Sequence, residues 1–564
     1  MRVLEQWPRR RLAALVIALI LVTGALLGGA RPRSFIASLS GSPSPAPTNT
    51  RVPPTATARP TATPSPSATP RPRVPQKPQY LVLIVLDGAR PDYFNVSGIP
   101  HVRALMNGGT TFNRAFTGIL ESETPSGHAS IGTGSTPQTD GILSFSWVAG
   151  NNTPVDLFSE PKVRAGDMER VLKTAGAPSI ASLVHRKDPG ARVVALSGHK
   201  YYAADAIGGP NADIIMYYYP KKVGTQELYG PTYIPGHAPP PSILNDPSLI
   251  EHSTHLKLGV EDHLAMSLAI KTFQTVHQKV TLINEPSFDW PLGHPDGANL
   301  DHKGVVVLMR QFDRDLAAME NAYRKAGVLD KTLFVVTADH GFAPISRTVD
   351  AGLIQKAVSD AGTSIVSATY HTAAYVWLAD PSKANIVAEN ISHDLNPYIQ
   401  GVYFRSIGTT GYDYLRASGP ELYHVPNVEQ AYQYLLQSFN SPNGPDIVVF
   451  YTEQTASKPG GQATWKGDHG GGDWEAQHVP LIFYGPGVRK GHLSTFPARL
   501  EDIAPTALAL MGIPDTGMQG IPLAPAMQHA TGAQWATVNR IRPQLGMVVT
   551  ALAGESRYDL ATGR

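Results

Sequence analysis

Four apolar runs indicate the strands of a buried sheet. Residues 80–86 (YLVLIVL), 280–283 (VTLI), 332–337 (TLFVVT) and 479–484 (VPLIFY) carry few polar side chains, which is typical of strands covered on both faces. Between them, apolar residues recur at spacings of four and three and predict a helix that ends at Gly327: Val305, Met309, Phe312, Leu316, Met319 and Tyr323. Strands that alternate with helices predict an α/β fold with a mostly parallel sheet and helices on both faces.

The amino-terminal residues have a different pattern. Arg9-Arg10-Arg11 precede nineteen uncharged residues, Leu12–Ala30, so we expect residues 1–35 to be an export signal or a membrane anchor, with the rest of the chain outside the cytoplasm. The apolar run is longer than the roughly 7–15 residues of a signal peptide, which favours a single uncleaved anchor at the cell surface. Gly28-Gly29-Ala30 also fits a cleavage site, and cleavage would give a secreted protein.

Residues 36–78 are expected to be a stalk. Residues 41–78 contain twelve prolines and no acidic residue. This composition favours extended polyproline structure over a packed core. A folded domain is then expected over residues 79–525, and residues 526–564 carry no motif and receive no predicted role.

The composition excludes several classes of protein. The chain has no cysteine, so a disulfide scaffold, a thiolate metal site and a cysteine nucleophile are excluded, and a metal ion would need His and oxygen ligands. Residues 1–78 hold eleven of the 47 Lys and Arg residues but one of the 45 acidic residues, which leaves 36 basic and 44 acidic residues and a net charge of −8. This acidic remainder argues against binding to a nucleic-acid backbone.

Several residues that could bind metal or act as a nucleophile follow the predicted strands or lie in glycine-rich segments. They are Asp87, Thr124, Asp289, His294, Asp339, His340 and His469. The carboxyl ends of parallel strands meet at one edge of a sheet, where ligands bind. Carboxylate and imidazole groups suit a metal ion when thiolate is absent.

These residues lie in an ordered set of segments that resembles the alkaline phosphatase superfamily, in its type I phosphodiesterase/nucleotide pyrophosphatase and threonine-phosphatase branch. The matching segments are LVLIVLDGARPDYF (81–94), TPSGHASIGTGSTPQTDGI (124–142), FDWPLGH (288–294), VVTADHGF (335–342), GDHGG (467–471) and DIAPTALALMGIP (502–514). The resemblance implies an alkaline-phosphatase-like catalytic domain over residues 79–525, with inserted cap segments.

The resemblance also implies a hydrolase of phosphoric esters with two bound divalent metal ions, usually zinc. One ion would be held by Asp87, Thr124, Asp339 and His340, and the other by Asp289, His294 and His469. Thr124 would attack the phosphorus of a small phosphate ester, such as a nucleotide, and form a phosphothreonine intermediate. Coordination to a dication favours the alkoxide that this attack requires.

The chain departs from the family in the spacing of its second set of ligands. The family has Asp-x-x-x-His, whereas Asp289 and His294 are five residues apart. Glu285 is therefore an alternative to Asp289, and His478 is an alternative to His469.

The residues that contact phosphoryl oxygens in relatives are matched only in part. Many relatives carry an Asn twenty-one residues after the nucleophile, where this chain has Phe145. Relatives that act on monoesters carry a Lys-x-Arg pair; Lys200 matches the Lys, and Tyr202 stands in place of the Arg. Lys200 is therefore predicted as a catalytic residue, with an ordinary surface lysine as the alternative. The choice between diesters and monoesters stays open.

Two segments of the chain are predicted to belong to the cap. Tyr217-Tyr218-Tyr219 and residues 229–241 are rich in aromatic residues and proline, so we expect cap segments that either stack an aromatic group or pack loops.

A sulfatase is excluded because SETPS (122–126) lacks the Cys/Ser-x-Pro-x-Arg motif. A phosphonoacetate-type hydrolase and a non-catalytic binding protein at the cell surface are the alternatives.

Overall fold

The computed structural model describes residues 77–563, apart from residues 150–152, 224–225, 253–256, 298, 300–301, 395, 409–410, 420–422 and 462–464. The predicted export signal or anchor and nearly all of the predicted stalk lie outside the described residues, so both stay predictions. Within the described part of the chain, we find no helix with the length and apolar character needed to cross a membrane.

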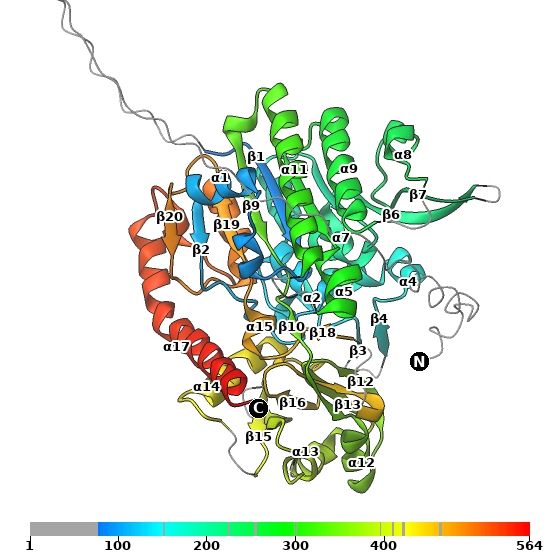
Figure 1. Cartoon of the computed structure of the whole chain (residues 1–564), viewed down its shortest axis with the longest axis vertical. Helices are drawn as coiled ribbons and strands as arrows, with labels where there is room; N and C mark the ends of the chain where they lie inside the picture. Colours follow the sequence, from blue (N-terminus) through cyan, green and yellow to red (C-terminus); the bar gives the residue numbers. More distant parts are fainter. Residues whose placement is uncertain are drawn as a thin grey trace, which may run out of the picture. The chain divides into compact units, whose positions relative to one another are not determined.

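A nine-stranded sheet forms the centre of the described residues (Figure 1). In spatial order its strands are β20 (His492–Ser494), β2 (Thr110–Phe112), β19 (Leu481–Tyr484), β9 (Thr332–Thr337), β1 (Tyr80–Leu86), β8 (Val280–Glu285), β5 (Val193–Ser197), β6 (Ile214–Val223) and β7 (Gln226–Tyr233). Strands β9, β1, β8, β5 and β6 run parallel to one another, and β19 is antiparallel to β9. The predicted mostly parallel α/β sheet is therefore confirmed.

The strands that carry site residues end at the same edge of the sheet. Strands β1 and β9 have the predicted bounds, and β8 is two residues longer than predicted. In the register of the sheet, Leu86 lies beside Glu285, and Val85 lies beside Thr337. Every residue of β8 and β9 is buried, which explains why these strands are mostly apolar in sequence.

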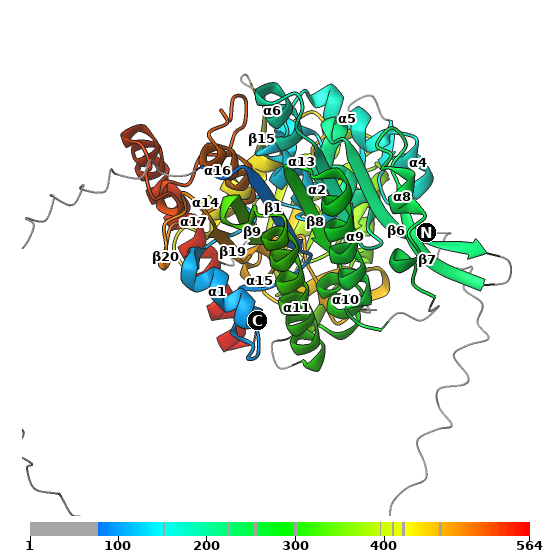
Figure 2. The same ribbon diagram turned by 90° about the horizontal axis from the view of Figure 1, so that it is seen from above.

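Helices cover both faces of the sheet (Figure 2). Helices α1, α9 and α11 pack together on one face, and α2 and α7 pack together on the other. The helices have these bounds: α1 Pro100–Gly108, α2 Thr124–Thr133, α3 Pro137–Asp140, α4 Glu160–Arg164, α5 Asp167–Ala175, α6 Ile180–Lys187, α7 Tyr201–Gly208, α8 Pro241–Leu244, α9 Val260–Val276, α10 His294–Asp296, α11 Lys303–Lys325, α12 Gly352–Asp360, α13 Ala384–Ser392, α14 Val428–Leu436, α15 Trp474–Gln477, α16 Ile503–Met511 and α17 Gly532–Thr562. The predicted helix is α11, which ends two residues before Gly327.

The tyrosine-rich segment belongs to the central sheet, so its assignment to a cap was wrong. Tyr217 and Tyr218 lie in β6 and are fully buried, and β7 pairs antiparallel with β6 at the edge of the sheet. The run from Ile214 to Tyr219 is apolar and aromatic throughout, and such a run favours a covered strand.

An inserted unit (residues 352–451) contains a second, antiparallel sheet. Its strands, in spatial order, are β12 (Ile365–Tyr370), β13 (Ala373–Leu378), β16 (Ile447–Tyr451), β14 (Ile399–Gly408) and β15 (Gly411–Arg416). The unit has a separate hydrophobic core that includes Val376, Val387 and Val449. It lies between β11 (Arg347–Asp350) and β17 (Thr455–Lys458), and these two strands pair in parallel.

The carboxyl-terminal residues form part of the folded core. Helix α17 packs against α14 and α15 and buries Val538, Leu545 and Leu552 (Figure 1). Residues 526–564, to which the sequence assigns no role, thus help to hold the inserted unit and α15 in place.

Candidate functional site

The ends of β1 and β9 bring three of the predicted ligands together. Ligand atoms of Asp87, Asp339 and His340 lie within 4.8 Å of one another, and all three side chains are buried. Gly88 turns the chain after Asp87 with a φ of +74°, a conformation that favours glycine, and its N–H donates to Asp339 Oδ1 at 3.2 Å. A Cβ atom at Gly88 would lie 3.2 Å from the Cβ of Asp289, so this turn keeps the strand ends close together.

Thr124 is the first residue of α2, and its side chain contacts this cluster. Its Oγ1 lies 3.5 Å from Asp87 Oδ1. The helix packs tightly here, since a Cβ atom at Gly127 would lie 2.6 Å from the carbonyl oxygen of Asp339. The positive end of the helix dipole therefore lies beside the Thr124 hydroxyl, where it stabilises negative charge.

Asp289, His294 and His469 form the second part of the site. Residues Phe288–Gly293 form a π-helical turn in which the N–H of His294 donates to the carbonyl of Asp289. This turn brings residues five apart in sequence to the same side. His294 Nε2 and His469 Nε2 lie 3.1 and 3.5 Å from Asp289 Oδ1, so the three side chains converge in spite of the longer spacing.

The three histidines use the same ring nitrogen to contact the backbone. Nδ1 of His294, His340 and His469 faces a backbone carbonyl oxygen at 3.0, 2.9 and 3.2 Å, respectively. These contacts favour the proton on Nδ1 and direct the lone pair of Nε2 into the site. The rings of His340 and His469 stack with centroids 3.6 Å apart. Histidines that bind metal are typically oriented in this way by their second nitrogen.

The site contains buried polar atoms that fit a pair of metal ions. Asp289 Oδ1 and His340 Nε2 have no hydrogen-bond partner among the described residues. Leaving such an atom unsatisfied costs about 1–3 kcal/mol. Ligand atoms of Asp289, His340 and His469 lie within 4.8 Å of one another, so the two parts of the site adjoin. Carboxylate oxygens with converging Nε2 atoms form the donor set that zinc binds when thiolate is absent.

Lys200 lies inside the site. Its Nζ contacts Asp289 Oδ2 at 2.5 Å, Asp87 Oδ1 at 2.8 Å and Thr124 Oγ1 at 3.1 Å. Burial alone would lower the pKa of Lys200, but Asp289 and Asp87 raise it well above its usual value. The surface-lysine alternative is therefore wrong, and one ammonium faces a surplus of carboxylates.

The pKa values of the histidines show where positive charge is favoured. Burial lowers the pKa of His340, but Asp339 and Asp87 together raise it to about 9. Burial and the nearby His340 lower the pKa of His469 to about 4. His469 is thus neutral at pH 7, which is the form of imidazole that binds metal.

The structure places both alternative ligands outside the site. The acidic neighbours of Glu285 are Asp262 in α9 and Asp315 in α11. Burial and the charges of these two residues raise the pKa of Glu285 well above its usual value. His478 Nε2 lies 3.2 Å from the carbonyl oxygen of Asn113. Neither side chain joins the groups of potential ligands formed by the described residues.

Two residues that sequence reasoning missed connect the ligands to one another. His128 Nδ1 lies 2.9 Å from the carbonyl oxygen of Thr124 and 3.1 Å from Asp339 Oδ2. Asn284 Nδ2 donates to Asp87 Oδ2 at 2.7 Å and lies 3.1 Å from His128 Nε2. The available signals were the position of His128 one helical turn after Thr124 and of Asn284 near the end of β8.

Phe145 and Tyr202 form an aromatic contact next to Lys200. Their rings meet edge to face with centroids 4.8 Å apart, and the N–H of Phe145 donates to Glu123 Oε2 at 2.9 Å. Packed aromatic rings therefore occupy the position of the Asn of many relatives and the position of the Arg of relatives that act on monoesters.

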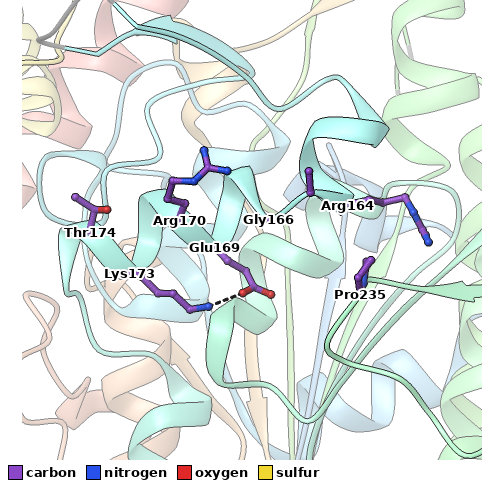
Figure 3. Close-up of a pocket in the computed structure, with 8 residues that line it drawn as sticks. Arg164, Gly166, Glu169, Arg170, Lys173, Thr174 and Pro235 are labelled. Carbon is purple, nitrogen blue, oxygen red and sulfur yellow. Dashed lines mark hydrogen bonds and ion pairs between the residues drawn. The ribbon is translucent and has the colours of Figure 1, made fainter.

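A separate cavity of about 590 Å³ contains none of the predicted site residues (Figure 3). It is lined by Arg164, Ala165, Gly166, Glu169, Arg170, Lys173, Thr174 and Pro235. Its cations already have partners: Lys173 pairs with Glu169 at 2.7 Å, Arg170 with Asp167 at 2.6 Å, and Arg164 donates to the Tyr217 hydroxyl at 2.8 Å. We assign no function to this cavity.

Comparison with known proteins agrees with the geometry of the site. The profile of the type I phosphodiesterase / nucleotide pyrophosphatase family matches residues 81–470, a range that contains every predicted site residue. The chain belongs to this family. The resemblance seen in the sequence is thus confirmed, and the protein is classed as an enzyme that hydrolyses phosphoric esters.

Solved structures with low sequence identity show the same fold. Human ectonucleotide pyrophosphatase/phosphodiesterase 5 is 16% identical, with a TM-score of 0.54, over 80% of this chain and 100% of that chain. An inactive form of the murine enzyme in complex with AMP is 14% identical, with a TM-score of 0.53, over 78% and 97%. The alkaline phosphatase PafA is 17% identical, with a TM-score of 0.60, over 81% and 100%.

A short segment of the chain is also similar in sequence to a sulfatase. Arylsulfatase K from Danio rerio is 42% identical over 57 residues, which is 10% of this chain and 11% of that protein. The match spans about a tenth of that relative, so it carries no conclusion about activity.

Proposed function

We propose that this protein is an exported, metal-dependent hydrolase of phosphoric esters that acts through a phosphothreonine intermediate. The observation that carries the proposal is the convergence of three imidazole Nε2 atoms on carboxylate oxygens, next to the hydroxyl of Thr124. One metal ion, zinc in most relatives, would be held by Asp87, Thr124, Asp339 and His340, and a second by Asp289, His294 and His469.

Thr124 would be the nucleophile. Its Oγ1 contacts Asp87 Oδ1 and accepts a hydrogen bond from Lys200 Nζ, and the amino end of α2 favours an anionic oxygen at this point. Bound dications would supply the positive charge that favours the alkoxide and stabilises the oxygens on phosphorus. Thr124 Oγ1 would bond to phosphorus as the alcohol leaves and takes a proton. Water would then hydrolyse the phosphothreonine and restore the hydroxyl.

The substrate would be a small phosphate ester with an organic substituent. The murine relative binds AMP, which supports a nucleotide as one candidate. The aromatic contact of Phe145 with Tyr202 supports a diester, because its second organic group could lie against these rings. A dianionic monoester would instead gain from an Arg in the place of Tyr202.

The location outside the cytoplasm rests on the amino-terminal sequence. Arg9-Arg10-Arg11 and the apolar run Leu12–Ala30 would hold the enzyme at the outer surface of the membrane, or release it if the chain is cleaved there.

The proposal is tested with the purified protein, the Thr124→Ala variant and two aryl esters. We expect about two zinc equivalents in both proteins by atomic absorption, because six candidate ligands remain in the variant. Turnover should fall by about 10⁴-fold or more in the variant, as when other nucleophiles are removed. Bis-aryl phosphate should be cleaved faster than mono-aryl phosphate.

Other outcomes would select the alternatives. Wild-type-like turnover in Thr124→Ala would remove Thr124 as the nucleophile. Bound zinc without turnover of any ester would indicate a non-catalytic binding protein, and cleavage of phosphonoacetate alone would indicate a carbon–phosphorus hydrolase.

A further inference from the structure

Four side chains of alternating charge lie next to the site. His371, in the inserted unit between β12 and β13, lies at the centre of the group. Its Nε2 is 2.7 Å from Glu123 Oε1, and its Nδ1 is 3.0 Å from Asp468 Oδ1. Asp468 Oδ2 accepts a hydrogen bond from Lys458 Nζ at 2.6 Å. We call Glu123, His371, Asp468 and Lys458 the His371 bridge.

Both carboxylates of the bridge adjoin residues of the candidate site. Glu123 directly precedes Thr124, and Asp468 directly precedes His469. Asp468 Oδ1 also accepts a hydrogen bond from the N–H of His469 at 3.0 Å. The ring of His371 is nearly parallel to that of His469, with centroids 6.0 Å apart. The bridge therefore connects the nucleophile segment with the segment that carries a predicted metal ligand.

The bridge is buried and balanced in charge. Glu123 and Asp468 are 2% and 0% exposed. An imidazole that contacts a carboxylate oxygen at each nitrogen donates from both nitrogens, so His371 is an imidazolium. Two negative and two positive groups then alternate along the bridge. Without His371, Asp468 would keep Lys458 as its cationic partner, whereas Glu123 would lose the cation that it contacts.

Other contacts from the same edge of the inserted unit hold the same two segments. Thr369 Oγ1 donates to Glu121 Oε1, and the N–H of Gly471 donates to Thr372 Oγ1 at 2.9 Å. Both partners lie within three residues of Thr124 or His469. The edge formed by residues 369–372 is thus packed against both segments, with His371 at its centre.

We infer that His371 is a positioning residue: by binding Glu123 and Asp468, it fixes the placement of Thr124 relative to His469. The inference rests on the proposed function for the roles of Thr124 and His469. It gives the inserted unit a part in the reaction, because the unit supplies the residue that aligns the nucleophile with the second metal site.

The test compares His371→Gln with His393→Gln, a change at an exposed histidine of the same unit. Zinc affinity of the weaker site is measured by competition with a chromophoric chelator, and kcat and KM are measured with bis-aryl phosphate. We expect His371→Gln to lower that affinity and kcat by about 10–100-fold each, as for other residues that orient metal ligands. KM should change little, and His393→Gln should behave as wild type.

A second variant provides a test that does not depend on the folding of His371→Gln. Glu123→Gln removes one carboxylate of the bridge and leaves His371 bound to Asp468, so it should lower kcat while both zinc ions stay bound. If His371→Gln does not fold, as judged by circular dichroism, wild-type kcat in Glu123→Gln would overturn the inference. Wild-type zinc affinity and kcat in folded His371→Gln would overturn it directly. A wild-type protein without esterase activity would instead contradict the proposed function, and the zinc titration would still test the bridge.

Discussion

Two buried groups of carboxylates and histidines in this molecule have similar composition but different surroundings. In the candidate site, Asp289 Oδ1 and His340 Nε2 face other ligand atoms and have no hydrogen-bond partner among the described residues. The second group is formed by His424, Glu555 and Asp559, where α17 packs near the start of α14. Here Glu555 Oε2 accepts hydrogen bonds at 3.0 Å from the N–H groups of His424 and Val425.

The difference shows that the partners of a buried acid decide its role. Backbone N–H groups compensate the charge of Glu555 and tie α17 to the segment before α14, so this carboxylate needs no bound cation. The carboxylate of Asp289 instead faces imidazole lone pairs as well as one lysine, and a metal cation would satisfy the carboxylate oxygen and the lone pairs together. We therefore propose metal binding for the first group and helix docking for the second.

Among the variants that test this comparison, the largest effect is expected when a predicted ligand of the candidate metal site is removed. Asp289→Asn should lose about one zinc equivalent and about 10³-fold in kcat/KM, which corresponds to about 4 kcal/mol of transition-state stabilisation. The matched control is Glu285→Gln, since Glu285 is a buried carboxyl at the end of β8, the strand that precedes Asp289, and it lies outside the site. Zinc content by atomic absorption and steady-state kinetics separate the two. Equal losses in both variants would contradict the assignment of Asp289 as a ligand.

A smaller effect is expected at Asp205, a buried carboxyl that lies outside both groups. Neither oxygen of Asp205, in α7, has a hydrogen-bond partner in the described part of the chain, and burial together with Glu169 raises its pKa to about 8. The folded protein thus keeps this proton between pH 4 and 8 and the unfolded chain does not, so stability falls as pH rises through that window.

Asp205→Asn removes this dependence. Between pH 5 and pH 7 the wild type should lose about 3 kcal/mol of unfolding free energy relative to the variant. Urea unfolding at both pH values measures the difference. A constant difference between the two proteins across this range would show that Asp205 is ionised in the folded state.

The smallest effect is expected in the group on α17. Glu555→Gln keeps one acceptor oxygen but loses the charge-assisted hydrogen bonds to the segment before α14, at a cost of about 1–2 kcal/mol of unfolding free energy. Urea unfolding gives the cost, and zinc analysis should still find the wild-type content. Loss of zinc in this variant would show that the group of His424, Glu555 and Asp559 also takes part in metal binding.

Much of the site could be predicted because its residues follow strands whose apolar runs are hard to mistake. Asp87 and Asp339 come just after β1 and β9, which are parallel neighbours that end at the same edge. Asp289 and His294 were predicted together although their spacing was unusual, and the π-helical turn that unites them has no clear signature in the sequence.

The remaining features depend on contacts between distant segments. The burial of Lys200 cannot be read from its neighbours in sequence, because lysine is usually exposed. Asn284 and Asp87 are 197 residues apart, and His371 belongs to an inserted unit whose place in the chain sequence reasoning did not predict. Strand β12 of that unit is only partly covered, so its hydrophobic pattern is weak.

The parallel pairing of β11 with β17 closes the inserted unit at its base. For a flexible segment whose ends are held together, the entropy of loop closure grows with the logarithm of length, and each doubling costs only about 0.6 kcal/mol. The outer parts of the unit could therefore be lengthened, shortened or exchanged for another domain at small entropic cost. The paired base and residues 369–372 are the parts that such a graft would have to keep.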